Sequence, residues 1–419
     1  MRWTADRSAG LDRLAAFVPL AGESYAQDRN HDEGAPLSGA RSNVSQLSPW
    51  LHAGLLSEHE VIEQVLAQHS PRACEQFVAE VFWRVYFKGY LEQRPTIWRA
   101  YVDERDAALA RLATDTACAD AYARATEGRT GIAAFDHWAR ELVATGYLHN
   151  HARMWVASIW IFTLRLDWQL GADWFLRHLI DGDAASNTLS WRWVAGLHTK
   201  GKHYLASAGN IAQFTARMPQ GPLAAEGLVA EAAPLVEPGE HARHELDLPA
   251  PPEADAFTEP FALLLHDEAA SHVPLGLSKA PALVIGAARP EARASGAVGE
   301  TARTFAREAV ANGMQKAASA FGCEATEWLE GVDLTAILAE AGIERVALPY
   351  LPHGWTRDAL WPDLAPLKGR NRIVQLLGAL ECRTWPQAKA GFFGVRKQIP
   401  AILAELGIAT LPGTDEMEH

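Results

Sequence analysis

The spacing of apolar residues changes partway along this chain, and that change restricts the fold more than any other feature. From about Leu11 to Phe214, apolar residues recur at helical spacing, as in EQFVAEVFWRVYFKGYLEQ, with few long β-branched runs. After Pro260, short apolar runs such as FALLLH and APALVIGA alternate with helical stretches. Such alternation is typical of βαβ units around a parallel sheet. The spacing therefore predicts an all-helical half followed by an α/β half.

The composition between the two patterns predicts where the halves join. Residues 216–260 are rich in Pro, Gly, Ala and Glu without strong periodicity, which is typical of an extended connector. We therefore expect a helical domain at 1–215, a linker at 216–260 and a Rossmann-like α/β domain with a parallel sheet at 261–419. A chain of 419 residues with 48% hydrophobic residues can form two cores.

Cysteine usage, hydropathy and charge exclude several classes of protein. The four cysteines (Cys74, Cys118, Cys323 and Cys382) lie far apart with no CxxC or Cys/His cluster, so we expect no disulfide framework and no metal centre. No apolar run suits a secretory signal or a membrane span, which favours a soluble, cytoplasmic protein. The formal net charge of -13 means that any DNA-binding face must be a local basic patch.

The segment HLIDGDAASNTLSWRW brings two carboxylates, an amide and two tryptophans close together in sequence. Taken alone, Asp181-Gly-Asp183 is more typical of an ordinary turn that caps a helix. Upstream, His149 and Arg153 are four residues apart and so share a helix face. We expect Arg153 and Asp181 to form a buried ion pair.

A second segment, FVAEVFWR, mixes charged and aromatic residues on one helix stripe. Phe77, Glu80, Trp83 and Arg84 fall on this stripe, which a purely structural helix would keep apolar. The presence of Glu80 therefore argues against a purely structural stripe.

These segments, together with Tyr25 and SQLSPWLHAGLLS, resemble the FAD-binding helical domain of DNA photolyases and cryptochromes, with several motifs in the same order and spacing. The resemblance implies that FAD is the cofactor. It implies a diphosphate-holding turn at Ser45–Ser48, in which Gln46 replaces a frequent arginine, and places Asn187 opposite flavin N5. The cofactor-binding residues that it implies are Tyr25, Ser45, Gln46, Leu47, Ser48, Phe77, Arg84, Tyr147, Arg153, Asp181, Asp183 and Asn187.

The resemblance also implies a substrate side and an electron-transfer route. Glu80, Trp83, Asn150, Met154 and Trp193 match the positions that contact a cyclobutane pyrimidine dimer, with the two tryptophans as walls for a flipped-out lesion. In the six-four-specific branch two histidines stand where this chain has Asn150 and Met154, so that lesion is disfavoured.

Trp191 and Trp168 match the first two members of the family's tryptophan chain, which photoreduces the flavin. The third tryptophan is missing from the neighbourhood of Asp115, so Tyr122, Trp98 and Trp174 stand as alternative ends of the chain.

The second half resembles the family's α/β antenna domain more weakly. FALLLHDEAASH is similar to its first strand and following turn, and TWPQAKAGFFGVRKQIP is similar to a stretch near its end. Since that domain ordinarily comes first, the resemblance implies a circular permutation, which is tolerable when the original termini are close together. An unrelated flavodoxin-like domain remains the alternative. A second, antenna chromophore is possible, but these residues do not identify it.

The resemblance implies light-driven, FAD-dependent repair of cyclobutane pyrimidine dimers, the activity of a deoxyribodipyrimidine photo-lyase. The expected partner is damaged DNA, single-stranded or double-stranded, and a monomer is expected. The alternative is a blue-light photoreceptor that signals to a protein partner through flavin photoreduction, which the acidic net charge favours. The dimer-contacting residues favour repair. A third alternative is a flavin-binding relic with weak activity.

Overall fold

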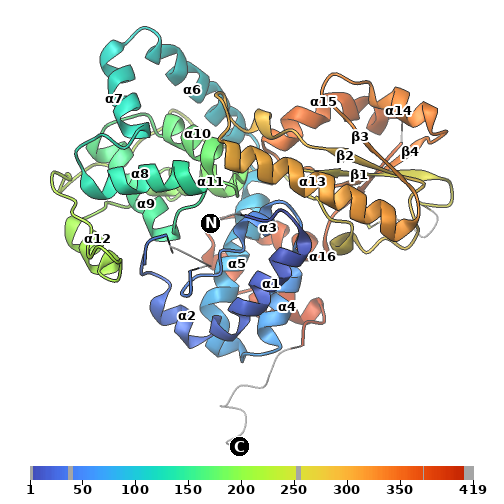
Figure 1. The fold of residues 1–419 in the computed structure, drawn as a ribbon, viewed down its shortest axis with the longest axis horizontal. Helices are drawn as coiled ribbons and strands as arrows, with labels where there is room; N and C mark the ends of the chain where they lie inside the picture. The colour runs from blue at the N-terminus through green and yellow to red at the C-terminus, as the bar shows by residue number, and fades with distance from the viewer. Residues whose placement is uncertain (1–2, 36–40, 252–255, 371, 410–419) are drawn as a thin grey trace, which may run out of the picture.

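The structure is a computed structural model that describes residues 3–35, 41–251, 256–370 and 372–409. The first half is helical, and its helices gather in two groups, α1–α5 and α6–α12 (Figure 1). These helices are α1 (Arg7–Phe17), α2 (Glu23–Asp28), α3 (Ser48–His52), α4 (Glu58–Leu66), α5 (Pro71–Glu92), α6 (Thr96–Leu112), α7 (Thr116–Thr126), α8 (Ala133–Thr145), α9 (Asn150–Ser158), α10 (Trp168–His178), α11 (Ala184–Ala195) and α12 (Ala208–Thr215).

The second half is built on a parallel sheet whose strands run in the order β3-β2-β1-β4-β5. The strands are β1 (Phe261–His266), β2 (Leu283–Ala287), β3 (Glu324–Glu327), β4 (Arg345–Pro349) and β5 (Ile373–Leu376). The helices are α13 (Glu300–Phe321), α14 (Leu334–Glu340), α15 (Trp355–Gly369), α16 (Ala379–Thr384), α17 (Phe393–Arg396) and α18 (Ile399–Glu405). This order of a helical half and a parallel-sheet half confirms the predicted fold class.

Helices cover both faces of the sheet, as the apolar pattern of its strands requires. Every residue of β1 is buried, and alternate side chains enter different cores. Leu264 packs with Leu338 of α14 and Leu360 of α15, whereas Leu263 packs with Met314 of α13. Figure 1 shows α13 running along the sheet on the side opposite α14 and α15.

The last helices of the chain pack on the helical half. Helices α16 and α17 lie against α5, and Trp385 between them approaches Gly89 of α5 so closely that an added Cβ there would lie 2.7 Å from the indole. The side chain of Gln93 also donates to the carbonyl of Trp385 at 2.7 Å. Residues 379–408 therefore belong to the same apolar core as α5.

Between Thr215 and Phe261 the described residues contain no helix or strand. Parts of this stretch still pack on the helical core, where Ala225 is buried and Leu223 and Val229 lie against it. The division into domains and linker stays a prediction. Within the described ranges, no helix is both long enough and apolar enough to cross a membrane.

Candidate cofactor site

A cavity of about 600 Å³ opens among the helices of the first half. Its walls come from α2, the turn before α3, α5, α9 and α11, together with the turn that precedes α11. A volume of this size, with a few polar groups among apolar walls, is typical of a small-molecule or cofactor site.

Local sequence signals place the wall helices. Helix α5 begins where Ser70 accepts the Ala73 N–H and Pro71 supplies the fixed first-turn geometry. Helix α11 begins in the same way, because the Asp183 carboxylate accepts the Ser186 N–H at 2.6 Å. The capping interpretation of this turn is therefore correct for Asp183.

Most of the predicted site residues line this one cavity. They are Tyr25, Ser45, Leu47, Ser48, Phe77, Glu80, Trp83, Arg84, Asn150, Arg153, Met154, Asp181, Asn187, Trp191 and Trp193. The stripe on α5 and the faces of α9 and α11 thus converge, although the segments lie far apart in sequence.

Four predicted residues do not line the cavity. Gln46, with a left-handed φ of 53°, turns its side chain back to accept the Arg41 N–H at 2.7 Å. Tyr147 lies behind the wall, with the guanidinium of Arg153 5.4 Å from its ring centre. Asp183 faces the other half of the molecule, and Trp168 packs on Tyr101 at 5.6 Å.

The predicted ion pair between Arg153 and Asp181 is present. The guanidinium donates to both carboxylate oxygens, at 3.1 Å and 2.9 Å, from a position four residues after the N-cap His149. Burial acts to raise the pKa of Asp181, but Arg153 and the Ser48 hydroxyl lower it, so that the carboxylate is charged. This pair places a fixed dipole at the cavity wall.

A second ion network lies behind the cavity, where the two halves meet. Lys88 of α5 contacts the carboxylates of Glu268 at 2.8 Å and Asp183 at 3.5 Å, and Arg84 reaches Asp183 at 3.2 Å. Burial opposes ionisation of Asp183, yet Arg84, Lys88 and His52 hold its pKa well below the usual value. His52, Asp183 and Glu268 could in principle hold a metal ion, but the two cations already neutralise these carboxylates.

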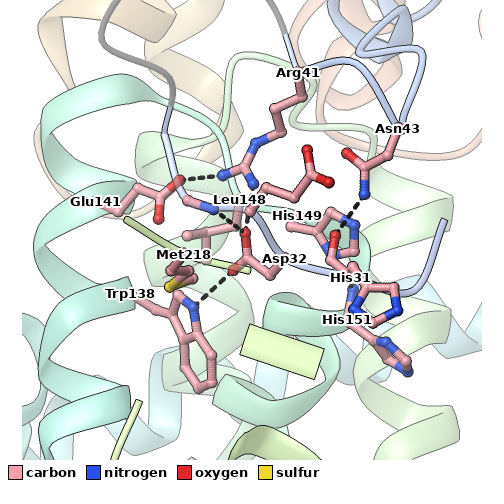
Figure 2. Close-up of polar contacts among 12 residues, drawn as sticks. His31, Asp32, Arg41, Asn43, Trp138, Glu141, Leu148, His149, His151 and Met218 are labelled. Carbon is pink, nitrogen blue, oxygen red and sulfur yellow. Dashed lines mark hydrogen bonds and ion pairs between the residues drawn. The ribbon is translucent and has the colours of Figure 1, made fainter. Parts of the chain in front are cut away.

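The turn at Ser45–Ser48 is held from outside the cavity by buried polar groups. Arg13 donates to the carbonyls of Ser45 and Val44, at 2.5 Å and 2.6 Å. Figure 2 shows Asp32 between Arg41 and Trp138, with an ion pair to Arg41 and a 3.0 Å hydrogen bond from the Trp138 indole.

Arg41 also reaches Glu141 at 2.6 Å, so one buried guanidinium bridges two carboxylates. Burial lowers the pKa of the neighbouring His149 to about 3, which keeps this ring neutral. The ion pairs of Arg41 therefore connect the segment before Ser45 to α8. Because His149 is neutral, it adds no further charge to this buried cluster.

The predicted substrate-side residues have partners that the sequence did not indicate. Glu80 accepts hydrogen bonds through one oxygen from Arg29 at 2.8 Å and from Gln76 at 3.0 Å. Trp83 stacks on Phe392 at 4.0 Å, and Trp193 stacks on Tyr204 at 5.9 Å. One face of Trp83 is thus covered by the last part of the chain.

Further residues line the cavity that sequence reasoning missed. Arg29, Asn30, His151, Phe175, Ser186 and Ser190 are among them. Ser186 and Ser190 flank Asn187 on α11, so the helical period of that segment was a usable signal. No local pattern marks Arg29, because its partner Glu80 lies far along the chain.

Trp191 lies beside Trp160, whereas the family resemblance implies Trp168 as the next member of the tryptophan chain. The Trp191 ring lies 6.2 Å from Trp160, which stacks on Trp174 at 5.7 Å and contacts Tyr122 at 6.0 Å. Trp160 belongs to a π-helical turn, Ile159–Thr163, and turns of this kind are frequent at functional sites.

The polar atoms of the cavity suit a flavin. The hydroxyl of Ser186 and the indole N–H of Trp191 are buried without a partner among the described residues, and both residues line the cavity. Asn187 donates its amide to the carbonyl of Ala172 at 2.9 Å, which leaves its oxygen free to accept from a ligand N–H. Orphaned groups of this kind are costly unless a ligand or water satisfies them.

Comparison with known proteins finds a family match over a part of the chain that includes most of α5 and all of α9 and α11 of the cavity wall. Residues 77–222 match the FAD binding domain of DNA photolyase. A deoxyribodipyrimidine photo-lyase from Streptomyces griseus is 38% identical over 157 residues, which cover 37% of this chain and 33% of that protein. A cryptochrome DASH from Danio rerio is 34% identical over 179 residues, covering 42% and 32% respectively.

Two crystal structures are similar to part of this chain. A class III photolyase from Agrobacterium tumefaciens is 28% identical with a TM-score of 0.41, over 51% of this chain and 43% of that one. A Synechocystis cryptochrome is 24% identical with a TM-score of 0.42, over 51% and 44%. The matched region thus spans less than half the length of each of these relatives.

Proposed function

We propose, from the match of residues 77–222 to the FAD binding domain of DNA photolyase, that the protein binds FAD and repairs cyclobutane pyrimidine dimers in DNA. When bound, FAD supplies light-driven transfer of one electron. The chain's own residues bind and orient the two partners of that transfer and exclude water from between them.

The observation that carries the proposal is the set of residues on one side of the cavity. Glu80, Trp83, Asn150, Met154 and Trp193 all line the same space as the flavin-facing Asn187. Two indoles supply flat apolar walls against which the saturated rings of a flipped-out pyrimidine dimer can pack. The amide of Asn150 adds both a donor and an acceptor for a pyrimidine edge.

Glu80 is the polar anchor in this proposal. Arg29 and Gln76 bind its Oε1, so that the second carboxylate oxygen is free to accept the imide N–H of a thymine. Because the helix α5 and two partners fix the carboxylate, little side-chain entropy is lost when a lesion binds.

We also propose that the order of the halves is a circular permutation. The segment after β1 packs directly on the helical half, where Ala270 donates to the carbonyl of Ala53 at 2.8 Å and Glu268 pairs with Lys88. This intimate packing supports two halves that evolved together as one unit.

The test is repair of a thymine dimer in single- and double-stranded oligonucleotides by the reduced protein under blue light, followed as recovery of thymine absorbance. Trp193→Ala should weaken lesion binding by about 5- to 100-fold, the worth of one stacked base, while Trp193→Phe retains most of it. Glu80→Ala should slow dimer splitting without loss of FAD.

Light-dependent recovery that neither Glu80→Ala nor Trp193→Ala reduces would contradict this site assignment. No recovery at all, with FAD bound and reduced, would favour the blue-light photoreceptor. The net charge of -13 gives that alternative its physical basis, because it opposes binding to a polyanion.

A further inference from the structure

The turn that presents Asp181 to the cavity is held from behind by the α/β half. Trp355, the first residue of α15, donates its indole N–H to the carbonyl of Gly182 at 2.9 Å. Arg293 lies over the same turn, with one nitrogen 3.5 Å from the carbonyl of Ile180. Both contacts join segments more than one hundred residues apart in sequence.

The packing around this turn leaves no free space. A Cβ on Gly182 would lie 2.2 Å from the Arg293 guanidinium, and a Cβ on Gly354 would lie 2.5 Å from the side chain of Ala184. Arg293 and Trp355 are 1% and 2% exposed, and the guanidinium lies 5.3 Å from the indole ring centre. Two glycines thus permit a contact that any larger residue would prevent.

The charges at this contact favour the same arrangement. Burial lowers the pKa of Arg293 to about 10, so it remains a cation at neutral pH, and it interacts with the carboxylates of Asp181 and Glu268. Two of its nitrogens have no partner among the described residues. Burying such a cation costs free energy. This desolvation cost is offset only while the turn Ile180–Asp183 and the nearby carboxylates stay close to the guanidinium.

We propose that Trp355 and Arg293 are positioning residues of the flavin site. They fix the turn Ile180–Asp183 so that Asp181 and its partner Arg153 face the cavity. The α/β half then acts on the cofactor site through packing and hydrogen bonds, whether or not it carries a chromophore of its own. By linkage, FAD binding and the docking of the α/β half strengthen each other. The inference rests on FAD as the ligand of the cavity and is independent of repair.

The test measures FAD affinity of the full-length protein, stripped of cofactor, in the dark and without DNA. Trp355→Phe keeps the ring but removes the N–H, and we expect it to raise the FAD Kd about 5-fold or more, as for one lost hydrogen bond. The matched control is Trp328→Phe in the same half. Trp328 is 1% exposed and likewise donates to a backbone carbonyl, but to that of Val332 at 2.8 Å, which is outside the turn Ile180–Asp183.

The two variants separate positioning from general stability. Both should lower the melting temperature, but Trp355→Phe alone should weaken FAD binding and change the visible circular dichroism of the bound flavin. Equal FAD affinity in the two variants would overturn the proposal.

If Trp355→Phe does not fold, Gly182→Ala tests the same contact from the other side, because its methyl group must displace Arg293. Unchanged FAD affinity in Gly182→Ala would overturn the proposal as well. Because FAD binding is measured without lesion or light, a failure of the repair proposal leaves this result unaffected.

Discussion

The ion pair between Arg153 and Asp181 allows a quantitative test of the cofactor site, through the substitution Asp181→Asn. The side chain of Asp181 is 3% exposed and that of Arg153 is 25% exposed, so removal of the carboxylate charge strands a largely buried cation. Breaking a fully buried pair costs about 3–5 kcal/mol. Since Arg153 keeps some access to water and still donates to the carbonyl of Leu148 at 3.0 Å, we expect a loss below that range, about 2–3 kcal/mol.

The assay is urea unfolding of the cofactor-free protein at neutral pH, with the free energy of unfolding compared at constant m-value. The control is Asp167→Asn, which removes one partner of the ion pair with Arg111. The side chains of Asp167 and Arg111 are 36% and 54% exposed, and a solvent-exposed ion pair contributes less than about 1 kcal/mol to the free energy of unfolding.

A double-mutant cycle isolates the coupling. Arg153→Met combined with Asp181→Asn should cost less than the sum of the two single changes, because the second removes a charge that the first has already left unpaired. Equal losses for Asp181→Asn and Asp167→Asn, or additive effects in the cycle, would refute the view that a buried pair organises this wall.

Two further predictions concern electrons and protons. The ring of Trp160, and not that of Trp168, lies beside Trp191, so Trp160→Phe should slow flavin photoreduction more than Trp168→Phe. The rate is measured as bleaching of the oxidised flavin under blue light. A larger effect of Trp168→Phe would support the electron-transfer route expected from the sequence. Burial lowers the pKa of His266 to about 4, so the unfolded chain takes up a proton below pH ~6.5 that the folded protein does not, and stability is lost as pH falls from there. His266→Asn should reduce that loss by about 1.4 kcal/mol per pH unit between pH 6 and 5 in urea unfolding, and an unchanged slope would show that this ring does not contribute.

The sequence predicts those parts of the site that depend on helical periodicity. The stripe of Glu80, Trp83 and Arg84 faces the cavity because side chains three and four residues apart share a helix face. The pair of Arg153 and Asp181 was also predictable, since a charge on an otherwise apolar face requires a partner.

The sequence does not show which side chains contact each other when they lie far apart along the chain. Gln46 occupies a left-handed backbone conformation and accepts from Arg41, and neither fact follows from its position in a motif. Asp183 was expected at the cofactor, and that role stays a prediction. In the structure one of its carboxylate oxygens caps α11 and the other pairs with Lys88, a contact that its place in the motif does not indicate. Tertiary packing decides such cases.

The contacts between the two halves bear on whether the proposed circular permutation can preserve the cofactor site. Phe392 of the last segment covers one face of Trp83, and the indole of Trp98 in the helical half donates to Asp358 of α15 at 2.7 Å. Trp355 and Arg293 support the turn that carries Asp181. The walls of the cavity come from the helical half, but groups of the α/β half support some of them from behind. A change in chain order is therefore acceptable only if it leaves this interface intact. A permutation satisfies that condition, because it moves the chain ends and keeps every noncovalent contact of the interface.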